Sequence, residues 1–207
     1  MASKAAILNA ALHHLGETES TDPLNDTATW VTRLRSRYDA KTRLLFEKHP
    51  WNFCTEVEQL SATEPTPEGW AYGFAKPNKC WRIVRVTNGG LSMDPKYPTL
   101  PYRDQAGRIL TNHETTYLMF IDGDWLSSEG SWPEVFAEAL AAELAWSVLP
   151  VSSANGDARD RLERIAKKNL REAKNWDAQQ NPIWQPPPSK WQVSRWSTQS
   201  GARRDGF

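Results

Sequence analysis

Four stretches of the chain carry hydrophobic residues at the spacing of an amphipathic helix, one every three or four positions. The stretches cover residues 3–15, 27–48, 132–149 and 157–177. Ser3 and Asp26 are the expected N-caps of the first two helices, and Gly16 and Pro50 are their expected ends. The third stretch is apolar on nearly every side, which is typical of a helix at the centre of a helical protein.

Between the two pairs of helices the hydrophobic residues recur at every second position, which predicts β-strands. The expected strands cover residues 70–74, 79–86, 107–111 and 115–121. Their short connections favour antiparallel pairing, because parallel strands need a long crossover. We therefore expect an α+β fold, in which the N- and C-terminal helix pairs form a four-helix bundle around an inserted small antiparallel β-domain.

The end of the chain shows neither the helical nor the strand spacing of hydrophobic residues. Pro186, Pro187 and Pro188 favour an extended backbone there. The sequence thus predicts a helical bundle from residues 1–55 and 131–177, a β-domain at 56–130 and an extended C-terminal arm at 178–207.

Three tryptophans distinguish this arm from an ordinary polar tail. Disordered segments are usually poor in aromatic residues, and burying a large apolar side chain contributes roughly 1.5–3 kcal/mol. A disordered tail is one interpretation. The other is that Trp184, Trp191 and Trp196 insert into pockets on a neighbouring chain, with Arg195 as a polar anchor.

Composition narrows the classes of function. The 207 residues include 25 Lys and Arg against 25 Asp and Glu, and this zero net charge argues against a protein that coats nucleic acid. The sequence has no apolar run long enough to cross a membrane and no secretory signal pattern. We therefore expect neither a transmembrane helix nor a signal peptide. Cys54 and Cys80 are too few for a disulfide scaffold or a four-cysteine zinc site.

A cluster of basic residues lies on the polar face of the second predicted helix. Arg33, Arg37 and Lys41 are its main members. A solvated face is the default interpretation. The alternatives are a contact with an acidic partner surface, or a weak contact with passing DNA if this face lines a channel.

The chain carries no hydrolase, nucleotide-binding or metal-binding motif, so we expect no enzyme activity, no catalytic residue, no bound metal and no cofactor. One alternative stays open. Asp122 and Asp124 lie close together beside Trp125, and a glycan-cleaving enzyme needs two carboxylates across a sugar. These residues are the first candidates for a virion-associated peptidoglycan hydrolase.

Several segments, in order along the chain, are similar to the tail tubular protein A family of short-tailed bacteriophages. They are residues 5–16, 25–28, 44–53, 72–86, 102–103, 107–111 and 132–145. The segment at 44–53 ends in His49-Pro-Trp-Asn-Phe53, and the segment at 132–145 begins with Trp132-Pro-Glu. The similarity ends near residue 177, so it does not include the C-terminal arm.

The resemblance implies a structural virion protein, the head-to-tail adaptor. Members of the family form a dodecameric ring that lies under the portal protein, continues the DNA channel and docks the tail nozzle protein. We therefore expect a homo-oligomer located at the head-to-tail interface of the virion, made in the host cytoplasm and not bound to membrane. The tryptophan arm would then bind the portal or a neighbouring subunit.

Overall fold

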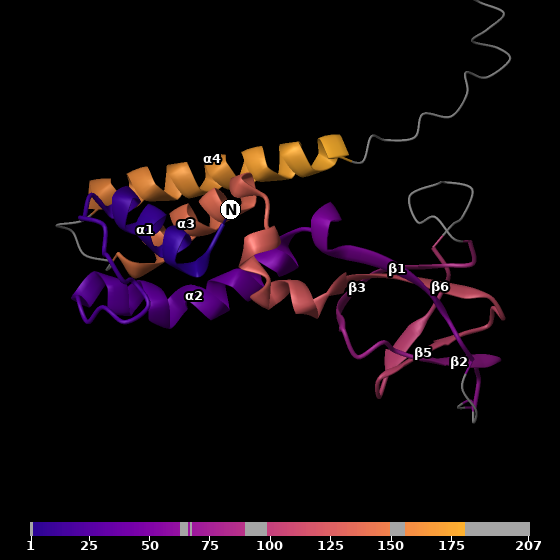
Figure 1. Cartoon of the computed structure of the whole chain (residues 1–207). Coiled ribbons are helices and arrows are strands. Elements are labelled where there is room, and N and C mark those ends of the chain that lie inside the picture. Colours follow the sequence, from indigo (N-terminus) through magenta and orange to yellow (C-terminus); the bar gives the residue numbers. More distant parts are fainter. Residues whose placement is uncertain (1, 63–65, 67, 90–98, 150–155, 181–207) are drawn as a thin grey trace, which may run out of the picture.

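The structure, a computed structural model, describes residues 2–62, 66, 68–89, 99–149 and 156–180. The fold is α+β, with the helices gathered at one end of the molecule and the strands at the other (Figure 1). The α-helices are α1 (Lys4–Leu15), α2 (Thr29–Lys48), α3 (Glu134–Val148) and α4 (Gly156–Gln180). Short 3-10 helices connect the two parts, namely η1 (Asn52–Cys54), η2 (Gly123–Ser127) and η3 (Glu129–Ser131).

The first helix has the ends that its sequence predicts. The Ser3 hydroxyl accepts a hydrogen bond from the backbone N–H of Ala6 at 3.1 Å, which satisfies one of the free donors of the first turn. Gly16 ends α1 in the left-handed region with a φ of 80°, a conformation that costs little only in glycine. The buried stripe of α1 consists of Ile7, Leu8, Ala11 and Leu12.

The third helix is the centre of the helical part, as its apolar sequence predicts. Its residues from Ala139 to Ala145 are all buried, and α1, α2 and α4 each pack mainly against it (Figure 1). The expected four-helix bundle, built from an N-terminal and a C-terminal helix pair, is wrong. The two N-terminal helices share a much smaller contact with each other than each shares with α3, so the helices are arranged around α3 and not as two pairs.

The start of α3 differs from that of α1. Pro133 is at its N-cap position, and no side chain caps the helix. Ser131 belongs to η3, and the Trp132 indole N–H donates to the carbonyl oxygen of Trp125 at 2.8 Å. The chain therefore enters α3 from a pair of 3-10 turns that Trp132 holds in place.

The strands form two three-stranded antiparallel sheets. The strands are β1 (Thr55–Leu60), β2 (Tyr72–Ala75), β3 (Cys80–Thr87), β4 (Arg103–Gln105), β5 (Arg108–Thr111) and β6 (Thr116–Asp122). One sheet has the order β1-β6-β3 and the other has the order β2-β5-β4. Their antiparallel pairing and the four strands expected from the sequence are confirmed, whereas β1 and β4 were not expected.

The two sheets share a small core of their own. Its buried hydrophobic members are Leu60, Phe74, Val86, Leu100, Ile109, Leu118 and Phe120, together with Cys80. Ile121, at the end of β6, belongs instead to the larger core of the helical part. Neighbouring residues of one strand thus serve two cores, which ties the first sheet to the helices.

Candidate functional site

An aromatic cluster, which we call the joint, packs α2 and α3 against the 3-10 segments that lead to β1 and follow β6. It consists of Phe46, Trp51, Phe53, Trp125, Trp132 and Phe136. Phe136 of α3 lies at its centre, with the rings of Phe46, Trp51, Phe53 and Trp132 packed edge-on at centroid distances of 5.0–5.3 Å. This edge-to-face geometry is the favoured one for aromatic pairs. The joint is therefore a closely packed connection between the two parts of the molecule.

The end of α4 is fastened to the same place through a buried carboxylate. Asp177 is only 2% exposed, and its carboxylate accepts from the backbone N–H of Asn52 at 2.8 Å. The Asn52 side chain donates in return to the Asp177 carbonyl oxygen at 2.7 Å. The His49 ring nitrogen Nε2 lies 3.1 Å from the second carboxylate oxygen. The sequence analysis did not identify Asp177. The available signal was its position, because this carboxylate lies in the otherwise apolar stripe of α4.

The two cysteines are free thiols inside the protein. Burial, with a smaller contribution from the Asp177 charge, raises the pKa of the Cys54 thiol to about 12. Burial also raises the pKa of Cys80. Both thiols are therefore protonated at neutral pH and behave as small hydrophobic side chains, since only the thiolate is a nucleophile or a metal ligand.

Two of the three basic residues expected to share a face of α2 lie together on its exposed side, and the third turns away. Arg33 and Arg37 are exposed, whereas Lys41 turns toward α3, where its Nζ lies 3.4 Å from the carboxylate of Glu143. Lys48 approaches the same carboxylate at 2.9 Å. Glu143 is 7% exposed, so these two lysines compensate a buried charge, as burial of a carboxylate requires.

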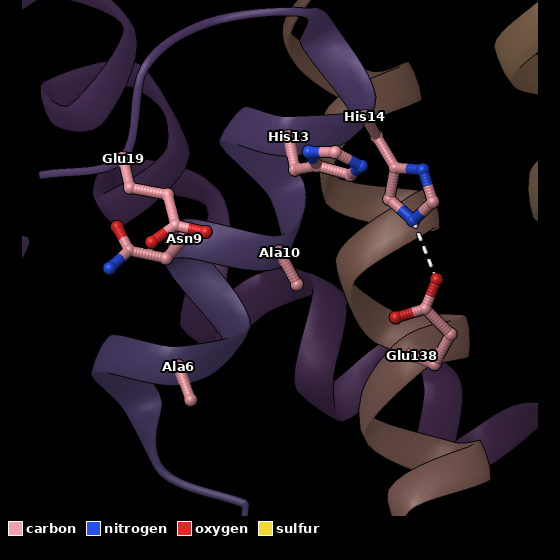
Figure 2. A pocket seen from close by; sticks show the side chains of 7 residues that line it. All are labelled: Ala6, Asn9, Ala10, His13, His14, Glu19 and Glu138. Carbon is pink, nitrogen blue, oxygen red and sulfur yellow. Dashed lines mark hydrogen bonds and ion pairs between the residues drawn. The ribbon is translucent and has the colours of Figure 1, made fainter.

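A groove about 500 Å³ in volume lies along the outer side of α1, and Figure 2 shows the side chains that line it. They are Ala6, Asn9, Ala10, His13, His14, Glu19 and Glu138. His14 Nε2 lies 2.8 Å from the Glu138 carboxylate, so the groove is closed on one side by a link between α1 and α3. This hydrogen bond lowers the pKa of Glu138, which keeps the carboxylate charged. Sequence reasoning did not find this groove, because Glu138 belongs to a helix distant in the sequence.

The remaining candidates differ in where they lie. Trp184, Trp191, Arg195 and Trp196 lie outside the residues that the structure describes. Asp122 is buried, and its carboxylate accepts from the backbone N–H of Asp124 at 2.9 Å, which makes it the cap of η2. Asp124 is exposed on the first turn of that helix. The pair is thus explained by a helix cap, a common use of an aspartate at such a position.

Within the described residues, no group of three or more His, Cys, Asp or Glu side chains could hold a metal ion. None of the helices in that part of the chain combines the length and the apolar character that crossing a membrane requires.

No protein-family model matches the chain, and none of the curated proteins does so.

Proposed function

We propose that this chain is a structural subunit of a head-to-tail adaptor ring of a short-tailed bacteriophage. In this proposal a ring of identical copies, dodecameric by resemblance to the tail tubular protein A family, joins the portal to the tail nozzle and continues the DNA channel. The subunit acts by holding contacts at both of its ends and catalyses no reaction.

The observation that carries the proposal is the joint. Two segments that resemble the adaptor family, residues 44–53 and 132–145, supply five of its six aromatic rings. Aromatic pairs of this kind contribute about 0.5–1.5 kcal/mol each beyond the burial of their area. A rigid connection transmits a force applied at the strands to the helices. An adaptor subunit that lies between the portal and the nozzle needs this property.

The surface near the joint supports a partner-binding role. Leu44 and Trp81 are large hydrophobic residues with exposed fractions of 40% and 38%. The Arg43 guanidinium lies 5.8 Å from the centroid of the Trp81 ring. Arginine and tryptophan are enriched where proteins bind proteins, so this surface, formed by α2 and β3, is suited to contact the portal or the nozzle.

The test is the assembly state of the purified full chain, alone and mixed with the portal protein encoded by the same genome. Light scattering should give the mass of a ring, or of a ring bound to portal, and electron microscopy should show closed particles. A chain that remains monomeric and does not bind the portal protein contradicts the proposal.

A further inference from the structure

The groove beside α1 has an acidic rim and a shallow floor. Its floor is made by the methyl groups of Ala6 and Ala10, with Glu19 on one side and Glu138 on the other (Figure 2). Among the described residues, His13, His14 and Asn9 also line the groove, and no lysine or arginine does so. Glu19 forms no ion pair or hydrogen bond within the described residues. The side chain of Glu138 is 50% exposed to solvent, although it is hydrogen-bonded to His14.

The exposed face of α2 has the opposite character. Arg33 and Arg37 are one helical turn apart, and the small residues Ser36 and Ala40 lie on the same face. Arg37 has no partner among the described residues, and the Arg33 guanidinium stacks on the Trp30 ring at 5.1 Å. Small residues beside the two arginines allow this helix to approach another surface closely, while the longer guanidinium side chains extend to groups on that surface.

These two surfaces lie on different sides of the helical part. In Figure 1, α2 runs along the lower edge of the helices, and α1 and α3 lie above it, below α4. The groove is lined by the side of α1 opposite its buried stripe, together with Glu138 of α3. One copy therefore cannot bring its own α2 face into its own groove, but two copies can meet in this way.

We propose that the groove lined by Ala6, Ala10, Glu19 and Glu138 receives the Arg33 and Arg37 face of α2 from a second copy of this chain. The guanidinium groups pair with the two carboxylates, and the alanines accommodate the helix. Because the two surfaces differ, the contact is head-to-tail, and its repetition closes a ring when the rotation per subunit allows closure. This inference rests on the proposed function and names the contact between subunits.

A second copy explains both surfaces at once. Nucleic acid would bind the arginines through its phosphates but would be repelled by the carboxylates of the groove. When the α2 face of a second copy enters the groove, its two arginines and the two carboxylates of the groove neutralise each other. Duplex DNA is therefore kept as the competing occupant of the α2 face, to be separated by experiment.

The test uses charge reversal on each surface of the full chain. Arg33→Glu with Arg37→Glu makes the α2 face acidic, and Glu19→Arg with Glu138→Arg makes the groove basic. Each double variant alone should self-associate at least about 10-fold more weakly than the wild type in sedimentation velocity, because like charges then meet. An equimolar mixture of the two variants should recover assembly, since every contact in an alternating ring again joins opposite charges.

Two controls separate this contact from general effects of charge or folding. Arg161→Glu with Arg164→Glu changes two arginines on the exposed side of α4 and should leave assembly unchanged. Glu138→Gln with Glu19→Gln removes the charges without reversing them, and should weaken assembly less than the reversal does. Recovery in the mixture is the strongest readout, because two misfolded variants would not restore each other.

Several results would overturn the inference. If the wild type forms rings that bind portal and neither double variant alters them, the adaptor function stands and this interface is wrong. If Arg33→Glu with Arg37→Glu abolishes binding of a 30-base-pair duplex while assembly is unchanged, the α2 face binds DNA. Failure of the variant mixture to recover assembly also counts against the paired surfaces. A wild type that stays monomeric with and without portal overturns both proposals.

Discussion

At the scale of single residues, Asp177 connects parts of the chain that are far apart in the sequence. It lies near the end of α4, yet its carboxylate meets the backbone and side chain of residues between α2 and β1. A carboxylate that is 2% exposed is stable only when its oxygens accept hydrogen bonds, and here both oxygens do so. This residue therefore fixes where the long fourth helix ends.

Replacement of Asp177 by alanine should be strongly destabilising. The variant leaves the partly buried backbone N–H of Asn52 without its partner and removes the acceptor near His49. The free energy of unfolding should fall by about 2–4 kcal/mol, as measured by urea denaturation. Asn175→Ala, which changes an exposed residue of the same helix, is the matched control and should cost less than about 1 kcal/mol. Equal losses in the two variants would mean that the hydrogen bonds of Asp177 do not stabilise the fold.

The link between His14 and Glu138 predicts a dependence of stability on pH. Because the folded state holds the Glu138 pKa below its ordinary value of 4.5, the carboxylate stabilises the fold above that pH. The contribution is lost as the pH falls through the lowered pKa. The difference in unfolding free energy between the wild type and Glu138→Gln, measured with urea, should therefore be larger at pH 6 than at pH 4 and should shrink further as the pH falls. A gap that stays constant over this range would assign the effect to something other than ionisation.

At the scale of elements, the joint depends on one side chain of α3. Phe136 is 1% exposed and contacts four other aromatic rings. Phe136→Ala should lower the free energy of unfolding by about 3–5 kcal/mol, since it removes a large side chain from a packed core. Val57→Ala, a change at a residue of β1 that is 41% exposed, should cost far less.

The joint also makes a prediction about cooperativity. In the wild type, near-ultraviolet circular dichroism of the tryptophans and far-ultraviolet signals of the helices should change in a single transition. If Phe136→Ala separates the two transitions, the joint is what couples the helices to the sheets. A wild type that already melts in two steps would contradict the rigid connection.

The elements that were predicted correctly are those whose structure is determined by a local pattern in the sequence. The α1 cap at Ser3 and the strand from Thr116 to Asp122 follow from a polar cap and from a dense run of β-forming residues. Strand β1 was missed because its sequence, Thr-Glu-Val-Glu-Gln-Leu, is mostly polar. This segment is a strand because it pairs with β6. Strand β4, Arg-Asp-Gln, is exposed throughout and is held by a tight turn at Ala106 and Gly107, both at positive φ.

At the scale of the whole molecule, periodicity shows which face of a helix is apolar but does not show which element covers it. The bundle prediction failed at this point, because α3 is apolar on nearly every side and packs against three helices at once. The same limit applies to the candidate site. Arg33 and Arg37 were identified as a charged face, whereas the inward turn of Lys41 toward Glu143 and the groove at Glu138 depend on packing between distant helices.

Removal of the residues beyond α4 separates their role in binding from the stability of the fold. The buried contacts of α4 end at Asp177, and the residues from Ala178 to Gln180 are exposed, so a chain that stops after residue 180 keeps every contact described here. Its unfolding temperature should lie within about 2 °C of the wild type. Binding to the portal protein should nevertheless be lost, because the truncation removes Trp184, Trp191 and Trp196.

Alanine substitution of these three tryptophans in the full chain distinguishes their indole rings from the rest of the segment. This triple variant should lose portal binding as the truncation does, whereas Trp176→Ala, which changes a tryptophan of α4 that is 37% exposed, should retain it. Light scattering of each variant mixed with portal protein provides the measurement. Normal binding by the truncated chain would remove the C-terminal segment from the mechanism. Normal binding by the triple variant alone would place the contact in other residues of that segment, because only the truncation would then have removed it.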